Sequence, residues 1–174
     1  IVSPEVPGSV VVIGGGAVGV EFAYLYSIYN ARVTLVEASD HILSNQDREI
    51  TRLLARSLTK QGIDILLETR VEKISATPQG VKILISSARK GEQELLTEQV
   101  MVATGRIANL EGLSLENARL TPEGGFLRVN DKMETNQKGI YAIGDVIGEP
   151  MLAHAASAEG VAAVEYMACI ERLP

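Results

Sequence analysis

The sequence predicts an α/β fold in which parallel strand–helix–strand units are followed by an antiparallel meander. Short β-branched apolar runs at 9–13 and 32–36 are typical of strands that are buried on both faces of a sheet. A glycine-rich turn and a helical stretch lie between them. Further along, a turn containing Pro and Gly at 77–80 separates the runs 71–77 and 81–85, which indicates a hairpin.

Both helices of this first part have predicted ends and predicted apolar faces. The first should follow the glycines and end at Asn30, which favours the left-handed conformation of a helix stop. Its apolar face is expected to comprise Val18, Phe22, Leu25 and Tyr29. The second should begin near Ser44, with Asp47 as the acidic partner of a capping box, and end at Gly62. Its apolar face is expected to comprise Ile50, Leu53, Leu54 and Leu58.

Two further strands complete the first part of the chain. They are expected at 63–67, where apolar residues alternate, and at 99–103. The stretch 109–125 is rich in turn residues and weakly patterned, so we place a domain crossing there. This gives a first domain at 1–112 and a second, partial domain at 113–174.

The second domain should combine strands with one helix. Strands are expected around 126–129 and 140–143, and the latter runs directly into Gly144-Asp145. A final helix, rich in small residues, should extend from about Ala153 to Glu171.

Composition excludes several classes of function. The net charge of −6 and the low aromatic content of 4% argue against a nucleic-acid-binding surface, which needs clustered Lys and Arg. No apolar run approaches the roughly 18 residues that cross a bilayer, so no membrane partner is expected. The single cysteine, Cys169, cannot form an internal disulfide or a multi-cysteine metal site, which fits a reducing compartment such as the cytoplasm.

The glycine turn has the spacing and the context of a dinucleotide-binding loop. Gly14, Gly16 and Gly19 form G-x-G-x-x-G between a buried strand and a helix. Gly14 permits the tight turn, Gly16 lets the backbone approach a diphosphate, and Gly19 lets the helix pack closely on the strand. A purely structural turn is the alternative for an isolated motif. The strand–turn–helix context favours a Rossmann-like domain whose helix N-terminus binds the diphosphate.

Glu37 provides the acid that such a site needs. It ends the second strand, eighteen residues after Gly19, where a carboxylate can accept hydrogen bonds from the adenosine ribose. A carboxylate there would repel a 2′-phosphate, so the site should prefer NAD(H) to NADP(H). Without the glycine loop, Glu37 would simply be a solvated residue at a strand end.

Later segments extend this pattern into a family resemblance. The segment 135–145, which ends in Gly144-Asp145, accompanies the glycine loop, Glu21, Glu37 and the Ala-Thr-Gly-Arg segment 103–106. Together they resemble the flavin-dependent pyridine nucleotide disulfide oxidoreductases. The segment 151–160, Met-Leu-Ala-His followed by Ala-Ala-Ser-Ala-Glu-Gly, is similar to the dihydrolipoamide dehydrogenase branch.

The resemblance implies contacts with two cofactors. The residues implied for NAD(H) are Gly14, Gly15, Gly16, Ala17, Val18, Gly19, Val20, Glu21, Glu37, Val71 and Gly105. Those implied for FAD are Asp145, Met151, Leu152, Ala153 and His154. For Val71 a role as a core valine is the alternative. One departure is Ala108, where the family commonly has Pro, and it should loosen a turn without removing a contact.

The family's chemistry is the oxidation of protein-bound dihydrolipoamide by NAD⁺ through a redox disulfide and FAD. The resemblance therefore implies a lipoyl-bearing protein of a 2-oxo acid dehydrogenase complex as partner, and a homodimer held by an interface domain. The family's Cys-x4-Cys disulfide, its first glycine loop and its His–Glu pair are not found in this sequence. We therefore expect an NAD-binding domain with an incomplete FAD-binding segment, no catalytic residue, no metal site and no turnover by this chain alone.

Two alternatives stay open on the residues. One is another enzyme of the same superfamily, such as a mercuric reductase or an NADH oxidase. The other is an NAD-binding module without catalysis.

Overall fold

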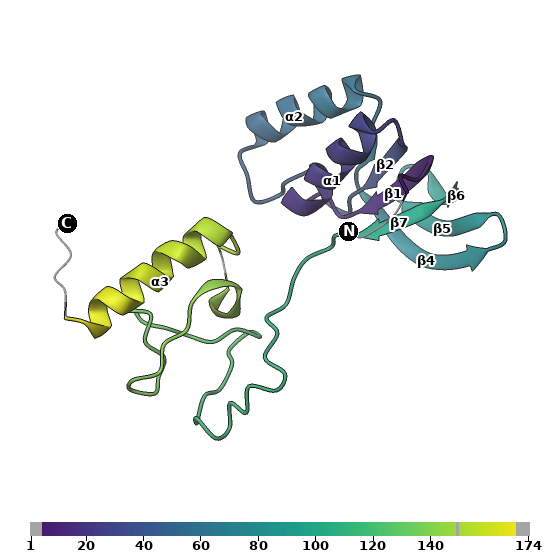
Figure 1. Cartoon of the computed structure of the whole chain (residues 1–174). Coiled ribbons are helices and arrows are strands. Elements are labelled where there is room, and N and C mark those ends of the chain that lie inside the picture. The colour runs from purple at the N-terminus through teal and green to yellow at the C-terminus, as the bar shows by residue number, and fades with distance from the viewer. Residues whose placement is uncertain (1–4, 149, 170–174) are drawn as a thin grey trace. The chain divides into compact units, whose positions relative to one another are not determined.

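The computed structural model describes residues 5–148 and 150–169 of the chain. The chain divides into two compact units, Ile1–Gly105 and Arg106–Pro174, which are described separately (Figure 1). The expected boundary between 112 and 113 falls inside the second unit, and the assignment of a cofactor to each unit stays a prediction. Within the described ranges, no helix combines the length and the apolar character needed to cross a bilayer.

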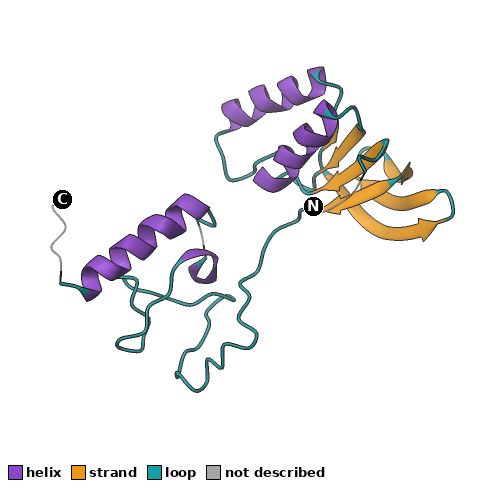
Figure 2. Ribbon diagram, viewed as in Figure 1, coloured by secondary structure: helices purple, strands orange, loops and turns teal. Residues whose placement is uncertain are grey.

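The first unit contains a parallel sheet with the strand order β3-β2-β1-β7. Its strands are β1 (Ser9–Ile13), β2 (Arg32–Val36), β3 (Asp64–Leu66) and β7 (Gln99–Val102). Helices α1 (Ala17–Ile28) and α2 (Arg48–Lys60) connect the first strands and lie on the same side of the sheet (Figure 2). Every pairing in this sheet is parallel, which confirms the predicted α/β fold.

An antiparallel sheet with the order β4-β5-β6 is the second layer of strands. Its strands are β4 (Thr69–Thr77), β5 (Gly80–Ser87) and β6 (Gly91–Thr97). The predicted hairpin turn is confirmed: Gly80 has a φ of +128°, and a Cβ there would lie 2.5 Å from the Thr97 carbonyl oxygen. The sequence does not predict β6, because its Glu- and Gln-rich side chains are largely exposed and only its backbone pairing with β5 defines it.

Strand β1 contributes to two hydrophobic cores. Val10 and Val12 pack with residues of the helices and of β2. Val11 and Ile13 pack with Ile85 of the antiparallel sheet. Because successive side chains of a strand point to opposite faces, both faces of β1 are covered, and its residues are no more than 8% exposed. This double burial explains why the run is continuously apolar.

The predicted apolar face of α1 is partly wrong, because only Val18 and Phe22 of its four residues are partly buried. The helix buries Gly19, Val20 and Ala23, whereas Leu25 and Tyr29 are 40% and 59% exposed. Most residues of α1 are apolar, so spacing alone does not identify the buried face, and the small residues let the helix approach the sheet closely. The predicted stop is confirmed, since Asn30 has a φ of +64°.

Helix α2 begins at Arg48 rather than near Ser44. Asp47 is its N-cap, and its carboxylate accepts hydrogen bonds from the backbone N–H groups of Glu49 at 2.8 Å and Ile50 at 3.3 Å. A side-chain acceptor at this position satisfies N–H groups that have no partner within the helix. Asp47 is therefore the cap itself and not the distal partner of a capping box.

The predicted apolar face of α2 is also partly wrong. Thr51 and Leu58 are the buried residues of this helix, whereas Ile50 and Leu53 are 61% and 56% exposed. One of these two buried residues is a threonine near the start of the helix, so a search for apolar residues alone misses this side. The expected end is confirmed by Gly62, which has a φ of +91°.

The two strands predicted in the second unit, at 126–129 and 140–143, are not formed. The described residues there make isolated antiparallel bridges that pair Glu123 with Phe126 and Glu134 with Tyr141. The loops pack instead around a small core of Leu120, Leu127 and Ala142. Their backbone groups find partners in neighbouring turns, which replaces a strand ladder.

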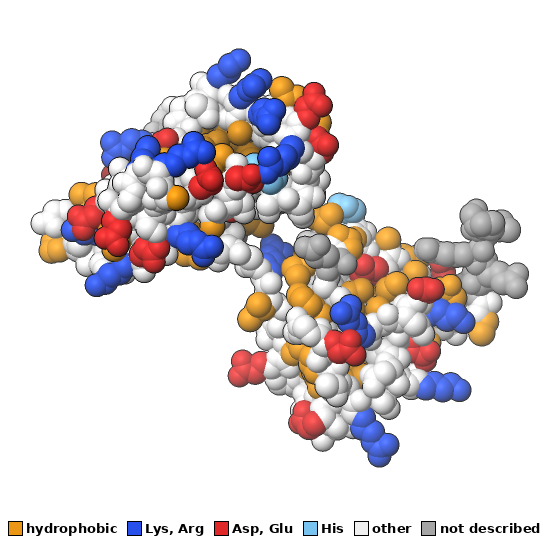
Figure 3. Space-filling model, turned by 180° about the vertical axis from the view of Figure 1, so that it is seen from behind, with side chains coloured by type: hydrophobic (Ala, Val, Ile, Leu, Met, Phe, Trp, Pro, Cys, Tyr) orange, Lys and Arg blue, Asp and Glu red, His pale blue; other side chains and the backbone are white. Residues whose placement is uncertain are grey.

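A 3₁₀ helix, η1 (Gly144–Ile147), and helix α3 (Ala153–Met167) complete the second unit. The predicted start of the final helix at Ala153 is confirmed, but the helix ends at Met167. Its expected end at Glu171 lies outside the described residues. Figure 3 shows acidic and basic side chains interspersed over the visible surface of each unit.

Candidate functional site

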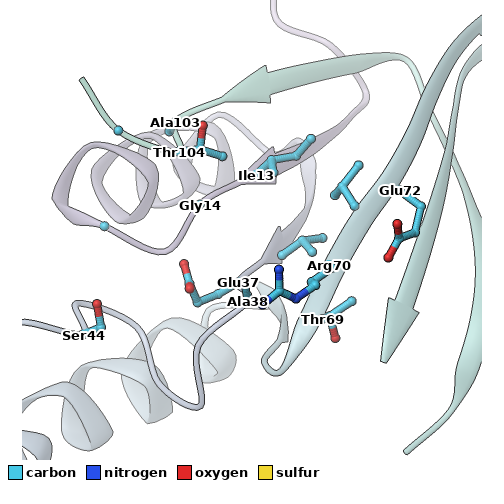
Figure 4. A pocket seen from close by; sticks show the side chains of 14 residues that line it. Ile13, Gly14, Glu37, Ala38, Ser44, Thr69, Arg70, Glu72, Ala103 and Thr104 are labelled. Carbon is cyan, nitrogen blue, oxygen red and sulfur yellow. The ribbon is translucent and has the colours of Figure 1, made fainter. Parts of the chain in front are cut away.

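A pocket of about 530 Å³ opens at the carboxyl ends of β1, β2 and β7 in the first unit. This is the edge of a parallel sheet at which α/β domains bind their ligands. Figure 4 shows the lining side chains, which come from the strand ends, the glycine turn and the start of β4. The lining residues are Ile13, Gly14, Gly16, Val36, Glu37, Ala38, Ser44, Thr69, Arg70, Val71, Glu72, Ala103, Thr104 and Gly105.

The backbone of the turn requires glycine at two motif positions. Gly14 has a φ of +106°, and a Cβ there would lie 2.4 Å from the Ala103 carbonyl oxygen. A Cβ on Gly19 would lie 1.8 Å from the Gly14 carbonyl oxygen. Neither obstacle is a flexible side chain, so a larger residue would force the turn, β7 or α1 to move.

Gly16 differs from these two glycines because its Cβ position has no other atom within 4 Å. It is also the N-cap of α1, and no side chain caps that helix end. Among the residues that the structure describes, the first N–H groups of α1 therefore have no side-chain acceptor, and they are available to an anion. Open space beside uncapped N–H groups fits a phosphate.

Glu37 is held by the backbone around it. One carboxylate oxygen accepts a hydrogen bond from the Gly15 N–H, and the other accepts one from the Ser39 N–H at 2.7 Å. Burial opposes ionisation of Glu37, but the hydrogen bonds from Ser39 and Gly15 outweigh it and lower the pKa of this carboxyl below its usual value. Each oxygen of an ionised carboxylate can accept a further hydrogen bond. The site thus presents a fixed negative group that can still accept from a ligand hydroxyl.

The loop after Glu37 folds back onto the glycine turn. The Leu43 N–H donates to the Gly15 carbonyl oxygen at 2.8 Å, and Leu43 itself has a φ of +50°. Leu43 packs against the core on the helix side of the sheet. This anchoring brings the neighbouring Ser44 into the pocket lining.

Strand β4 forms the opposite wall. The Glu68 N–H donates to the Ser39 carbonyl oxygen at 2.9 Å, and the Thr69 N–H donates to the Glu37 carbonyl oxygen at 3.0 Å. The pairing register of β4 shifts between residues 71 and 73. Such a bulge changes the direction of neighbouring side chains, and four consecutive residues, 69–72, line the pocket.

The structure brings together five of the residues predicted for NAD(H): Gly14, Gly16, Glu37, Val71 and Gly105. Gly15 lies beside them, because a Cβ on Gly15 would lie 2.9 Å from a Glu37 carboxylate oxygen. Gly19 is buried against the turn. Val18 is partly buried and does not line this pocket.

Three other predicted residues, Ala17, Val20 and Glu21, line a different hollow. It lies between α1 and α2 and has a mostly apolar lining that includes Tyr24 and Leu54. The structure thus separates these residues from the pocket beside Glu37.

Several residues that line the pocket are not among those predicted from the sequence to contact NAD(H). The sequence predicts a helix start near Ser44, and Thr69, Arg70 and Glu72 lie next to the predicted Val71 without a motif of their own. Only the tertiary structure identifies the residues of β4, because backbone hydrogen bonds join the segment 68–69 to the segment 37–39. Ala103 and Thr104 belong to the Ala-Thr-Gly-Arg segment, whose glycine alone is among the predicted site residues.

The residues predicted for FAD lie in the second unit. Asp145 belongs to η1, and its carboxylate pairs with the Arg106 guanidinium at 3.2 Å. The Gly144 N–H donates to the Glu159 carboxylate at 2.7 Å, which ties η1 to α3. The remaining residues predicted for FAD lie at the start of α3, and they are Met151, Leu152, Ala153 and His154. Leu152 is the N-cap of this helix and makes no side-chain hydrogen bond there. His154 is exposed, as are Leu152 and Ala153.

The parallel sheet, the glycine turn and the pocket at the strand ends define a Rossmann-like α/β domain. Residues 1–160 match the family model described as pyridine nucleotide-disulphide oxidoreductase. The chain belongs to this family. Membership implies a flavin, FAD, and a pyridine nucleotide, NAD(P), as the family's cofactors.

Known relatives agree with this membership. The chain is 38% identical to a dihydrolipoyl dehydrogenase of Bacillus subtilis over 171 residues, which cover 98% of this chain and 36% of the relative. It is 30% identical to the solved HOCl-induced flavoprotein disulfide reductase RclA from Escherichia coli, with a TM-score of 0.86, covering 99% of this chain and 39% of that one. The crystal structure of LpdA from Mycobacterium tuberculosis has a TM-score of 0.86 at 26% identity, covering 99% and 37%. The chain therefore spans little more than a third of the length of these proteins.

Proposed function

We propose that this chain is the nucleotide-binding part of a dihydrolipoyl dehydrogenase, which oxidises protein-bound dihydrolipoamide with NAD⁺. The family membership and the identity to dihydrolipoyl dehydrogenases support the reaction class. The observation that carries the proposal is a carboxylate, Glu37, fixed by backbone N–H groups beside an open glycine turn.

The nucleotide lies across the carboxyl ends of the strands in this proposal. Its diphosphate occupies the open space at Gly16 and accepts hydrogen bonds from the N-terminus of α1, an interaction of about 0.3–1 kcal/mol at an exposed site. Its adenosine ribose donates to Glu37, and its nicotinamide half extends toward Gly105. Since Glu37 is ionised, a 2′-phosphate is repelled and NAD(H) is preferred to NADP(H).

The second unit contributes to the FAD site of the same enzyme. Asp145 accepts a hydrogen bond from the ribityl chain of the flavin, and the segment 151–154 packs along the cofactor. Two features support this assignment: the Asp145 carboxylate is half exposed beside Arg106, and the start of α3 makes no side-chain cap. In the complete enzyme the lipoyl-bearing protein of a 2-oxo acid dehydrogenase complex is the partner, and the enzyme is a homodimer.

Positioning is the role of these residues in catalysis. FAD supplies the electron-transfer chemistry when it is bound. The chain contributes the wall that orients the nicotinamide, so that hydride transfer occurs within a preformed complex and not between free reactants. We assign no acid, base or nucleophile to the described residues of the pocket.

The decisive test of the nucleotide site is titration of the ¹⁵N-labelled chain with NADH. The amide signals of Gly14, Gly15 and Gly16 should shift, whereas that of Gly62, beyond α2, should not. If the signals of the turn stay unmoved while the protein is folded, the nucleotide site is refuted.

A charge-reversing variant tests the role of Glu37. Glu37→Arg should shift the preference from NADH toward NADPH, because an attractive charge replaces a repulsive one. Glu49→Arg makes the same charge change in the first turn of α2, away from the pocket, and should leave the ratio of the two dissociation constants unchanged. An unchanged ratio in Glu37→Arg would contradict the assignment.

The likeness to RclA favours a second candidate, a flavoprotein disulfide reductase with a different disulfide substrate. The full-length protein that contains this chain separates the two. Reduction of NAD⁺ by dihydrolipoamide supports the first proposal, whereas consumption of a reduced nucleotide without dihydrolipoamide activity supports the second.

A further inference from the structure

A positively charged side chain, that of Arg70, lines the same pocket as Glu37. The hydrogen bond from the Thr69 N–H to the Glu37 carbonyl oxygen, at 3.0 Å, places the start of β4 beside the end of β2. Arg70 follows directly and lines the pocket. Figure 4 shows its guanidinium directed toward Ala38 and Glu37. A positive and a negative side chain therefore flank the same part of the pocket.

The Arg70 guanidinium makes no hydrogen bond or salt bridge with any residue that the structure describes. The carboxylate of Glu37 already accepts from the N–H groups of Gly15 and Ser39. Other arginines do pair with carboxylates, namely Arg48, Arg89, Arg106 and Arg128. A guanidinium carries five N–H donors in a planar fork that matches phosphate oxygens. Arg70 thus presents unused cationic donors to the pocket.

We propose that Arg70 is a second specificity-determining residue of this site and can bind the 2′-phosphate of a phosphorylated dinucleotide. The negative charge of Glu37 masks this ability. This inference rests on the proposed nucleotide site. The adenosine ribose lies against Glu37, so a phosphate on its 2′-oxygen comes close to both side chains. Glu37 repels it and Arg70 attracts it. Repulsion prevails because backbone N–H groups hold Glu37 in place, whereas the exposed Arg70 side chain is free to move away.

One further charged group lines this wall. Glu72 lies in the irregular part of β4 and accepts a hydrogen bond from the Ser86 hydroxyl. Its negative charge also disfavours a phosphate. Because Glu72 is present in every variant compared below, its contribution cancels when one nucleotide is compared between variants.

The test is a cycle of variants measured with NADH and with NADPH by calorimetry. It comprises the unaltered chain, Glu37→Gln, Arg70→Met and the double variant. Lys73→Met is the control, since it removes a positive charge from the same strand outside the pocket lining. We expect Glu37→Gln to bind NADPH about tenfold more tightly than the unaltered chain, because the Arg70 guanidinium can then form charge-assisted hydrogen bonds with the 2′-phosphate.

The double variant should lose that gain, and Arg70→Met alone should weaken NADPH more than NADH. Lys73→Met should change neither dissociation constant by more than about twofold. The gained affinity should also fall with added NaCl, because salt screens an exposed ion contact. The proposal is overturned if the double variant keeps the tighter NADPH binding of Glu37→Gln. It is also overturned if a folded Glu37→Gln protein binds NADPH no more tightly than the unaltered chain.

Two measurements keep the outcome clear. Since a glutamine at position 37 can accept only one of the two backbone hydrogen bonds well, Glu37→Ala repeats the test, and circular dichroism checks folding. If neither variant folds, Arg70→Met alone decides the test. A lower ratio of NADPH to NADH affinity than in the unaltered chain supports the proposal, and an unchanged ratio contradicts it. Failure of the unaltered chain to bind NADH refutes the nucleotide site, whereas NADH binding without any effect of Arg70 refutes this inference alone.

Discussion

Replacing Gly19 or Gly16 by alanine should have opposite consequences, although both lie in the same turn. A Cβ on Gly19 would lie 1.8 Å from the Gly14 carbonyl oxygen, so α1 would have to move away from the turn. Overpacking of this kind costs about 1–3 kcal/mol or more. The better helix propensity of alanine offsets about 1 kcal/mol of that cost. Because the obstacle is backbone, we take the upper end of the cost.

We therefore expect Gly19→Ala to lower the free energy of unfolding by about 2 kcal/mol or more. For a unit of this size the loss corresponds to a fall in Tm of about 8–16 °C. Gly16→Ala should cost less than about 1 kcal/mol, since its Cβ meets no atom within 4 Å and only the preference for glycine over alanine at an N-cap is lost. The methyl group would instead enter the proposed diphosphate site and weaken NADH binding by about tenfold or more.

Thermal unfolding by circular dichroism and NADH titration by calorimetry, applied to both variants, separate these effects. A Gly19→Ala chain that melts within about 2 °C of the unaltered chain would refute the steric reasoning. A Gly16→Ala chain that binds NADH with unchanged affinity would refute the placement of the diphosphate.

Three further outcomes are expected. Asp47→Ala removes the N-cap of α2 and should lower stability by about 1 kcal/mol, seen as a fall in Tm of about 4–8 °C; an unchanged Tm contradicts that role. In the folded chain the pKa of Glu37 is held below its usual value, so this group contributes stability that is fully present above the unfolded-state pKa and is lost as the pH falls through the folded-state pKa. Glu37→Gln should therefore reduce the acid sensitivity of unfolding measured by denaturant titration, and an identical pH dependence would count against the shift. The purified chain should be colourless, because the family's first glycine loop for FAD is absent from this sequence, and near-stoichiometric flavin absorbance would contradict this expectation.

The elements that bury both faces or adopt an unusual backbone were predictable. The short, largely β-branched runs of β1 and β2 favour buried strands, and the structure pairs them in parallel. Asn30 and Gly62 end their helices with positive φ angles, as their chemistry suggests. Such features depend on the local backbone, which the sequence determines directly.

Other predictions failed because a neighbouring element decides the outcome. In α1 the small residues Gly19 and Ala23 face the sheet while Leu25 is exposed. No spacing rule identifies that choice, since both sides of the helix are apolar. The strands expected at 126–129 and 140–143 are replaced by turns, because no strand in the described part of the chain pairs with them in a ladder.

The candidate site shows the same division. From the sequence alone, the glycine spacing and the acid at the end of β2 indicate a nucleotide loop, because tight turns and carboxylates have local signatures. Only the tertiary structure places Ser44 and Arg70 in the same pocket, because backbone hydrogen bonds between distant segments bring them there. The sequence determined which backbone can approach a ligand, and the packing of β4 against the end of β2 decided which charges lie around it.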